Sequence, residues 1–503
     1  MSNLTQTINA PNGVSYQQPT GLFINNEWVP SSTGQKLPSI NPATEEEIIS
    51  VYAATAQDVD KAVRAARAAF EGHEWQGVVG TARGRLMLKV ADLVESQQHV
   101  LATIEALDNG KPYSQALGDI EEVFSVFRYY GGWADKTYGQ AIETGRHKFT
   151  YTVREPIGVC GQIIPWNYPL GMAAWKLGPA LACGNTVVIK AAEQTPLSIL
   201  YLANILVEAG FPPGVVNIIN GYGSEAGSAL VQHPEVDKVA FTGSTPTGKQ
   251  IMRMASDTMK NITLETGGKS PLVIFDDAQI PNAVKWAHYG VMGNMGQICT
   301  ATSRIFVHEK IFDTFAQAFR RYVAKTQVIG CPFDAKTYQG PQVSKGQFEK
   351  ILEYGRIAEQ EGATILSGGK IAEARPNGKG FFVEPTIISN AQPHMRVYKE
   401  EIFGPFAVLV KFSAETEAIR LANATEYGLA AAVCTSDITR AHRVANKLKA
   451  GMVWINSSNN SDFRVPFGGV KQSGIGRELG QAGLEAYSQL KSVHLNLQLT
   501  EQI

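Results

Sequence analysis

Short apolar runs alternate with helix-forming stretches over most of the chain, and this alternation constrains the fold more than any other feature. From Arg154 the runs GVCGQIIP, NTVVIK, GVVNIIN and KVAFTG are typical of buried strands. The stretch TPLSILYLANILVEAG, between the second and third runs, predicts a helix with Thr195 as its cap, Pro196 in its first turn and Gly210 at its end. Strand, helix and strand at this spacing predict a parallel α/β sheet.

A second series of the same kind runs from about Ser270 to about Gly476. Its apolar runs are PLVIF, SRIFVH, FAVLVKF, AAAVCT and GMVWIN. A chain of 503 residues is long enough for several domains, and its 44% of hydrophobic and 18% of charged residues are ordinary for a globular protein. We therefore expect two α/β units.

Two alternating segments, HKFTYTVRE and SVHLNLQL, lie outside both series. Their apolar positions are Phe149, Tyr151 and Val153 in the first and Val493, Leu495, Leu497 and Leu499 in the second. Half-buried strands outside a domain need partner strands, and another subunit is a reasonable source.

Charge and residue usage exclude several classes of function. Lys and Arg total 45 and Asp and Glu total 46, so no charge bias favours nucleic acid or an anionic membrane. No run of about 20 apolar residues predicts a membrane span. The 5 cysteines form no CxxC pair and the 9 histidines no ligand-spaced cluster, so we expect neither disulfides nor a metal site. The N-terminal segment lacks an apolar core and has no arginine before Arg64, which predicts a cytoplasmic protein.

Two residues could carry chemistry. Cys299 lies in GNMGQICTATSR, where two nearby glycines allow close backbone approach, so it could be an exposed nucleophile. The alternative is a small buried side chain, as most free cysteines are. Glu265, in LETGGKSP, could be a partly desolvated general base or a solvated carboxylate in a turn.

Two segments could bind a nucleotide. GSTPTGKQ begins at Gly243, directly after the strand KVAF, and such a turn can present backbone N–H groups to phosphate. It departs from GxxxxGK[ST] at Gln250 and from GxGxxG at Thr245, so a plain tight turn stays equally open. Lys190 and Glu193 lie at the carboxyl end of a predicted parallel strand, where ligands bind in open sheets. A carboxylate there could hold ribose hydroxyls or complement a helix dipole.

Eight motifs in order resemble the NAD(P)-dependent aldehyde dehydrogenase superfamily, in particular its non-acylating members of classes 1 and 2. The motifs are NPATEEEI, PWNYP, KAAEQTP, FTGSTPTG, LETGGKSP, GQIC, EEIFGP and PFGGVKQSGIGREL. The resemblance covers nearly the whole chain, from FINNEWV to the C-terminal strand. It implies an α/β fold with two doubly wound parallel-sheet domains, one Rossmann-like for the cofactor and one catalytic, plus a β-strand oligomerisation arm.

The resemblance also divides the chain. The first twenty residues are polar and rich in Gln and Asn, which is typical of a loose arm. The expected parts are 1–20 as a flexible N-terminal arm, 21–136 and 157–267 as the NAD-binding domain, 268–476 as the catalytic domain, and 137–156 and 477–503 as the oligomerisation arm. The arm would pair sheets between subunits, giving a homo-oligomer, either a dimer or a tetramer.

The reaction that the resemblance implies is oxidation of a small-molecule aldehyde to the carboxylic acid. The Cys299 thiolate would attack the carbonyl, and the side-chain amide of Asn167 would hold the oxyanion with the Cys299 N–H. Loss of hydride to the nicotinamide would leave a thioester, which water activated by Glu265 would hydrolyse. Lys176 and Glu478 match positions of a proton relay.

The matched positions also predict the cofactor and substrate sites. The expected cofactor residues are Ile164, Pro165, Trp166, Lys190, Glu193, Gly223, Gly243, Ser244, Gly248, Glu401 and Phe403. The expected tunnel residues are Tyr168, Met172, Trp175, Met292, Ile298, Thr300, Ser458, Ser461 and Phe467. Glu193 favours NAD over NADP, because a 2′-phosphate would face a carboxylate. Many members carry aromatic residues where Met292, Gly293, Ser458 and Ser461 stand, so we expect a wider and more polar tunnel mouth.

Other functions fit less well. A CoA-acylating semialdehyde dehydrogenase usually lacks the base that Glu265 supplies. A non-catalytic structural member of the fold would not need Cys299, Glu265 and Asn167 together. A phosphate-loop NTPase fails on Gln250 and on the lack of a supporting acidic strand end. Betaine aldehyde is a less attractive substrate, because its ammonium group needs an aromatic cage that the serines of the mouth weaken.

Overall fold

The four apolar runs of the first series form adjacent parallel strands in the computed structural model, which describes residues 4–498. They are β9 (Val159–Ile163), β10 (Thr186–Lys190), β11 (Val216–Ile219) and β12 (Lys238–Thr242). β9 pairs with both β10 and β12, so the strand order reverses at β9. The full order of this eight-stranded sheet is β21 (Gly474–Ile475), β13 (Asn261–Glu265), β12, β9, β10, β11, β3 (Leu22–Ile24) and β4 (Glu27–Val29).

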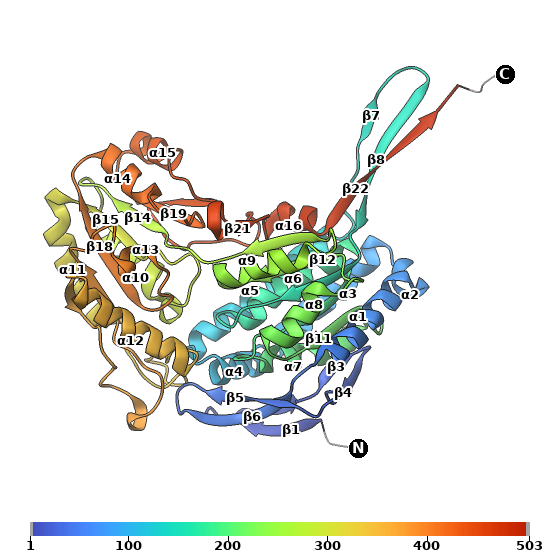
Figure 1. Ribbon diagram of the computed structural model, residues 1–503, viewed down its shortest axis with the longest axis horizontal. Helices are drawn as coiled ribbons and strands as arrows, with labels where there is room; N and C mark the ends of the chain where they lie inside the picture. The colour runs from blue at the N-terminus through green and yellow to red at the C-terminus, as the bar shows by residue number, and fades with distance from the viewer. Residues whose placement is uncertain (1–3, 499–503) are drawn as a thin grey trace.

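Helices cover both faces of this sheet (Figure 1) because neighbouring apolar residues on each strand point to opposite faces. Val159 packs in the core beneath one helix layer, whereas Cys160 packs in the core beneath the other. The first layer contains α1 (Ala56–Glu71), α8 (Ser228–Gln232) and α9 (Thr245–Ala255). The second contains α3 (Gly80–Ser96), α4 (Gln98–Asp108), α5 (Tyr113–Trp133), α6 (Pro169–Cys183), α7 (Leu197–Ala209) and α16 (Gly480–Ala486). The unit is therefore doubly wound, as predicted.

All five runs of the second series are strands of a second, seven-stranded sheet. Its order is β16 (Thr364–Ser367), β17 (Thr386–Ser389), β18 (Phe406–Phe412), β15 (Arg304–His308), β14 (Pro271–Ile274), β19 (Ala430–Cys434) and β20 (Met452–Ile455). The pairs are parallel except β16 with β17. Its helices are α10 (Ile280–Met292), α11 (Phe312–Thr326), α12 (Lys345–Gln360), α13 (Arg396–Lys399), α14 (Glu415–Asn423) and α15 (Ile438–Ala445).

The start of α7 differs from the prediction. Gly210 ends the helix in the left-handed region with φ 97°, as expected, but the Thr195 hydroxyl has no hydrogen-bond partner among residues 4–498. The buried carboxylate of Asp108 accepts from the Leu197 N–H at 2.8 Å instead. A side chain from α4, 89 residues earlier in the chain, therefore satisfies a donor of the first turn, which local sequence could not reveal.

The prediction of a flexible arm over residues 1–20 is wrong for its described part, and residues 1–3 lie outside the described residues. β1 (Thr5–Asn9) and β2 (Ser15–Pro19) form an antiparallel hairpin. Tyr16 is buried against Tyr201 of α7, with ring centroids 6.2 Å apart. The fully buried Gln18 donates to the Leu197 carbonyl at 3.2 Å. One aromatic side chain and one amide therefore anchor a segment whose composition is otherwise that of a loop.

A third sheet projects from the body at the upper right of Figure 1. β22 (Ser488–Asn496) pairs with β8 (Lys148–Pro156), and β8 also pairs with β7 (Ala141–Glu143). Both segments predicted as alternating strands are thus in one sheet, although Leu499 lies outside the described residues. β21 pairs with β13 and α16 packs on α6, so the expected boundary at residues 476 and 477 falls inside a segment that belongs with the first sheet.

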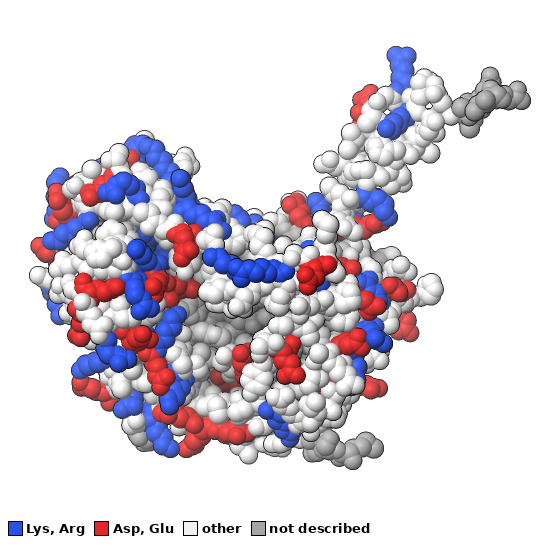
Figure 2. All heavy atoms as spheres, viewed as in Figure 1, with Lys and Arg blue, Asp and Glu red and all other residues white. Residues whose placement is uncertain are grey.

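Two smaller features complete the body. β5 (Lys36–Asn41) and β6 (Glu46–Tyr52) form a separate hairpin, and α2 (His73–Gln76) follows α1. Acidic and basic side chains are interspersed on the face in Figure 2, in keeping with the balanced composition. Among residues 4–498, no helix has both the length and the apolar character to cross a membrane.

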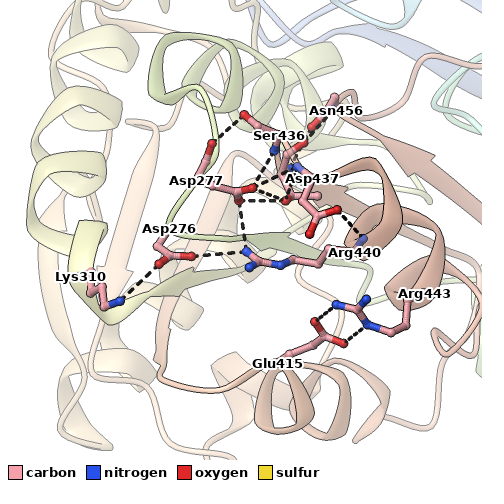
Figure 3. Close-up of polar contacts among 10 residues, drawn as sticks. Asp276, Asp277, Lys310, Glu415, Ser436, Asp437, Arg440, Arg443 and Asn456 are labelled. Carbon is pink, nitrogen blue, oxygen red and sulfur yellow. Dashed lines mark hydrogen bonds and ion pairs between the residues drawn. The ribbon is translucent and has the colours of Figure 1, made fainter.

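A polar network joins the ends of β14 and β19 to α15 (Figure 3). The Asp277 carboxylate accepts from the Thr435 hydroxyl at 2.8 Å and from the backbone N–H groups of Ser436 and Asp437 at 3.1 and 3.0 Å. Arg440 also donates to Asp277, at 3.2 Å. One carboxylate thus satisfies donors from a strand end, a turn and a helix.

We expect Asp277→Ala to lower the free energy of unfolding by about 1–3 kcal/mol, because several donors would lose their acceptor. The measurement is the thermal unfolding midpoint, by calorimetry. Asp313→Ala is the control, since that carboxylate is 85% exposed and its ion pair with Lys411 spans 3.9 Å. An equal shift in both variants would contradict the role given to Asp277.

Candidate active site

The carboxyl ends of β9, β12 and β13 lie side by side at one edge of the eight-stranded sheet, because β12 pairs in parallel with both neighbours. The segments that follow these strands line a cavity of about 630 Å³. Loops attached to the second sheet, including residues 298–300 and 401–403, line the same cavity. The site therefore lies between the two α/β units. Figure 2 shows a hollow between these units on the face that it draws.

Cys299 and Glu265 line this cavity together. Cys299 is half-buried, whereas Cys160, Cys183 and Cys434 are buried. Desolvation and the neighbouring Glu265 carboxylate raise the pKa of the Cys299 thiol well above its usual range. The Cys299 thiol therefore lies on the cavity wall, where a nucleophile could meet a ligand. Because its pKa is raised, the thiol keeps its proton until a base removes it.

Glu265, the last residue of β13, is 3% exposed, and its Oε1 has no hydrogen-bond partner in the described part of the chain. Burial, together with the nearby Glu478 carboxylate, raises its pKa to about 8, while Lys176 opposes the shift. A carboxyl group with this pKa can hold or accept a proton near neutral pH.

A left-handed turn positions the loop of Cys299. Asn294, Met295 and Gly296 have φ values of 43°, 57° and 74°. A Cβ at Gly296 would lie 1.9 Å from the backbone carbon of Gly404, so only glycine fits at this position. The following Gln297 accepts from the Val343 N–H at 3.0 Å. The cysteine is therefore held by a rigid turn rather than by a free loop.

Asn167 follows β9 and lines the cavity beside the cysteine loop. Its Nδ2 donates to the Gln297 carbonyl at 3.0 Å, which orients the amide towards residues 297–299. The backbone carbonyl of Asn167 accepts from Lys111 Nζ and from Asn294 Nδ2, both at 3.1 Å. These bonds fix an amide donor close to the thiol.

Lys176 and Glu478 form a buried ion pair behind the cavity. Lys176, on α6, also donates to the Thr242 hydroxyl at 2.7 Å. Neither Lys176 nor Glu478 lines the cavity, whereas Thr242 does. The two charges are near enough to Glu265 to shift its pKa in opposite directions.

At the carboxyl end of β10, Lys190 Nζ lies 3.5 Å from a carboxylate oxygen of Glu193. Burial lowers the pKa of Lys190, while Glu193 opposes that change. Nearby, Ser244 caps α9 by accepting from the Thr247 N–H at 3.3 Å, and Gly243 and Ser244 line the cavity. A lysine, a carboxylate and a helix N-terminus thus lie at the same edge of the sheet, after β10 and β12, which flank β9.

Glu401 and Phe403 reach the cavity from the second unit. Glu401 Oε1 accepts from the Gly268 N–H at 2.9 Å. A Cβ at Gly267 would lie 2.1 Å from Glu401 Oε2, so a glycine there makes room for the carboxylate. The Phe403 ring packs edge-on against Trp166, with centroids 5.2 Å apart.

Most of the predicted site residues meet at this cavity. Those that line it are Pro165, Trp166, Asn167, Tyr168, Met172, Trp175, Gly243, Ser244, Glu265, Ile298, Cys299, Thr300, Glu401, Phe403, Ser461 and Phe467. Those that do not are Ile164, Lys176, Lys190, Glu193, Gly223, Gly248, Met292, Ser458 and Glu478. The second set includes Lys176 and Glu478, expected as the proton relay, and Lys190 and Glu193, expected at the adenosine ribose.

Two of the predicted tunnel residues are corrected by their surroundings. Met292 is fully buried in the core between α10 and the second sheet. Ser458 is also fully buried, and its hydroxyl lies 2.9 Å from that of Thr302. Both side chains turn into the protein, Ser458 although the next residue, Asn459, lines the cavity, so neither forms the tunnel wall.

Several lining residues were not predicted. They are Gly118, Asp119, Glu121, Glu122, Ser125, Gly171, Thr242, Gly267, Tyr289, Gln347, Lys350, Asn459, Asp462, Phe463 and Leu479. Gln347 donates to the Phe403 carbonyl at 2.6 Å, and Lys350 donates to the Glu401 carbonyl at 3.1 Å. Gln347 and Lys350 lie on α12, which has the sequence of an ordinary amphipathic helix, so no local motif indicates that these two residues line a cavity.

Comparisons with known proteins agree with this geometry. The model of the aldehyde dehydrogenase family matches residues 28–493. An aldehyde dehydrogenase from Aspergillus niger is 52% identical over 99% of this chain and 99% of its own length. The human protein named aldehyde dehydrogenase, mitochondrial is 51% identical over 97% of this chain and 94% of its own.

A solved structure is also similar. The NAD+ complex of an aldehyde dehydrogenase from Bacillus cereus superposes with a TM-score of 0.93 at 48% identity, covering 95% of this chain and 97% of that chain. Its fold agrees with the two doubly wound units described above. On the family match, on identities of about half over nearly full length and on the shared fold, the chain belongs to the aldehyde dehydrogenase family.

Proposed function

We propose that this aldehyde dehydrogenase oxidises an aldehyde to the carboxylic acid with NAD, through an intermediate covalently bound to Cys299. The observation that carries the proposal is the meeting of Cys299, Glu265 and Asn167 at one cavity. A thiol, a buried base and an amide donor are the groups that acyl chemistry at a carbonyl carbon requires.

The first step is addition. Glu265 accepts the thiol proton, the sulfur of Cys299 bonds to the aldehyde carbon, and the carbonyl π electrons move to oxygen. The Asn167 amide and the Cys299 backbone N–H stabilise this oxyanion. Because Gln297 already orients the amide, little reorganisation is needed as charge develops.

The second stage is oxidation and hydrolysis. NAD, when bound, would supply the acceptor for the hydride that leaves the thiohemiacetal carbon. The thioester then remains on Cys299. Glu265 releases the thiol proton towards Thr242, Lys176 and Glu478 and, once it is ionised again, takes a proton from the water that attacks the thioester. The C–S bond breaks, the acid leaves, and the thiol is restored. Thr242, Lys176 and Glu478 extend from Glu265 into the protein and can carry the released proton.

The residues at the strand ends fit a dinucleotide. Lys190 and Glu193 offer a donor and an acceptor to an adenosine ribose, and the N-terminus of α9 at Ser244 favours the negative charge of a pyrophosphate. Glu401, set deep in the cavity with its pKa raised by burial, offers an acceptor for the second ribose. The printed title of the Bacillus cereus relative, an NAD+ complex, supports the same cofactor. The first unit is then the NAD-binding domain and the second the catalytic domain.

The substrate tunnel has aromatic walls. Tyr168, Trp175 and Phe467 line it, and the Trp175 and Phe467 rings pack edge-on with centroids 4.8 Å apart. Because Ser461 replaces an aromatic residue at the mouth, a branched or aryl aldehyde has room to enter. Glu265 disfavours the CoA-acylating alternative, in which no water needs activation.

The projecting sheet supports assembly into a homo-oligomer. Its exposed apolar side chains include Ile142, Phe149, Leu490 and Leu495. Apolar strands that project from the body gain stability by pairing with another sheet, and a second copy of this chain supplies one. The cytoplasmic location stays a prediction, and a human relative is named as mitochondrial.

Cys299→Ala should abolish the CoA-independent formation of NADH from hexanal, because no other lining side chain is a thiol. NADH absorbance is followed with NAD and NADP, each with and without CoA. Cys331→Ala is the control, since that thiol is exposed and lies outside the cavity. Full activity in Cys299→Ala would contradict the proposed mechanism.

The pH dependence of turnover should report Glu265. Its pKa of about 8 means that the carboxyl group is protonated at pH 6 and ionised at pH 9. As a base it works only when ionised, so kcat should rise with pH through about 8. Glu265→Gln should lower kcat by about 100- to 10,000-fold and remove this rise. A variant that kept the same pH profile would show that another group titrates.

Glu193→Gln should raise kcat/KM for NADP relative to NAD, because a 2′-phosphate would no longer face a carboxylate. We expect a change of about 5- to 30-fold, since removing one unfavourable charge contact is worth about 1–2 kcal/mol. Steady-state kinetics with each cofactor test it, with Glu74→Gln as the control for an exposed carboxylate far from the strand ends. An unchanged ratio would argue against Glu193 as the selecting residue.

A further inference from the structure

The turn after α4 supports the segment that carries Asn167. Lys111 Nζ donates to the Asn167 carbonyl at 3.1 Å, and Asn109 Nδ2 donates to the Trp166 carbonyl at 2.7 Å. Both donor side chains are fully buried. Two consecutive residues of the cavity wall are therefore held by side chains that lie 56 and 57 residues earlier in the chain.

The ammonium group of Lys111 offers three N–H donors, and three partners surround it. It forms an ion pair with Asp119 on α5, it donates to the Asn167 carbonyl, and it lies 4.3 Å from the centre of the Tyr168 ring. A cation over the face of an aromatic ring is attracted by the negative charge of that face. The buried charge is therefore compensated, and the side chain is held next to residues 167 and 168.

The turn itself is fixed by close packing. Gly110 has φ 85°, and a Cβ there would lie 2.6 Å from Pro42 Cγ and 2.8 Å from Pro341 Cγ. A Cβ at Gly340 would lie 2.0 Å from the Gly110 carbonyl oxygen. The backbone of the turn is thus packed against two other segments of the chain, so its side chains project from a rigid base.

The helix before this turn supports the same segment. Glu105, on α4, is buried, and its Oε1 accepts from the Leu170 N–H at 3.2 Å, at the start of α6. Glu105, Asn109 and Lys111 do not line the cavity, whereas Trp166 and Asn167 do. Residues 105–111 therefore act on the cavity through residues 166–170 rather than on a ligand directly.

The cysteine loop also contacts Asn167. Asn294 Nδ2 donates to the Asn167 carbonyl at 3.1 Å, and the Asn167 amide donates to the Gln297 carbonyl at 3.0 Å. That amide has two N–H groups, so the other can hold the oxyanion proposed to form beside Cys299. A donor must lie about 2.7–3.1 Å from the position that the oxyanion will occupy, so a small shift of the Asn167 backbone weakens the contact.

We propose that Lys111, with Asn109, is a positioning residue for the Asn167 amide, and that the buried ammonium of Lys111 holds this amide at the distance that the oxyanion requires. This inference rests on the proposed function, because it takes Asn167 as the oxyanion donor. Lys111 acts through Asn167 and needs no contact with the aldehyde or with NAD. A charged donor suits this role, since hydrogen bonds from ionised groups are about twice as strong as those between neutral groups.

The test is a double-mutant cycle of Lys111→Met and Asn167→Ala, measured in the first turnover. The NADH of that turnover is followed by stopped-flow absorbance with saturating NAD and hexanal, which reports addition and hydride transfer without hydrolysis of the thioester. Asn167→Ala should lower the rate by about 100- to 1000-fold. Lys111→Met alone should lower it by about 10- to 100-fold, as expected when a hydrogen bond from a charged group is lost.

The decisive value is the effect of Lys111→Met when residue 167 is already alanine. Without the amide there is nothing left for Lys111 to position, so the further loss of rate should stay within about twofold. A general structural role would lower the rate by the same factor in both backgrounds. The affinity for NADH, measured by fluorescence titration, should be unchanged in Lys111→Met, because Lys111 does not line the cavity.

Lys89→Met is the matched control. Lys89 is exposed, donates to the Glu208 carbonyl at 2.6 Å and lies outside the cavity, so the same substitution removes the same kind of hydrogen bond elsewhere. It should leave the first-turnover rate unchanged. If Lys111→Met does not fold, Asn109→Ala takes its place in the cycle, because it removes a neutral hydrogen bond to Trp166 and leaves the ion pair of Lys111 intact. We expect Asn109→Ala to lower the rate by about 3- to 10-fold, again only while the Asn167 amide is present.

The outcomes separate the two proposals. No NADH from any aldehyde with the wild-type enzyme, or a full first-turnover rate in Asn167→Ala, would overturn the proposed function or its oxyanion donor. A slow Asn167→Ala variant combined with a wild-type rate in Lys111→Met would overturn only the role given to Lys111. Losses that multiply in the double variant, or an equal loss in Lys89→Met, would overturn that role as well.

Discussion

Parallel pairing of β12 with β9 and β13 is the constraint on which the site depends. Each strand ends at the same edge, so the residues that follow the strands meet although they are far apart in the sequence. Asn167 follows β9, Gly243 and Ser244 follow β12, and Glu265 ends β13. The second unit then closes the cavity with the loops of Cys299 and Glu401. The parallel register of these strands therefore brings the residues of the site together.

The buried pair of Lys176 and Glu478 links this edge to the end of the chain. Glu478 precedes α16, which packs on α6, and β21 adds to the same sheet by pairing with β13. Breaking a buried ion pair leaves an uncompensated charge, which is strongly destabilising. The two residues therefore hold the C-terminal segment on the first unit while lying next to Glu265. This structural role and the proton transfer proposed for the pair would depend on the same contact.

The parts of the fold that could be predicted are those written in local patterns. Apolar runs identified the strands of both sheets, and the motifs around Cys299, Glu265 and Glu401 identified residues that do meet. The predictions that were wrong concern residues whose side-chain orientation, or whose contact partners, depend on distant parts of the chain. Met292 precedes the cysteine loop but turns into the core, and Tyr16 anchors a hairpin whose sequence is otherwise polar. Glu122 lies on an ordinary helix, so its position on the cavity wall emerges only once α5 is packed.

The raised pKa of Cys299 has a consequence for the durability of the protein. Oxidants such as peroxide react with the thiolate rather than with the thiol, so a cysteine that keeps its proton at neutral pH is oxidised slowly. Because the pKa of Glu265 is about 8, most of this carboxyl group is protonated at neutral pH and cannot accept the thiol proton. The proposed nucleophile therefore rests as a thiol, and the burial that makes a base necessary for the proposed chemistry also slows oxidation of the sulfur between turnovers.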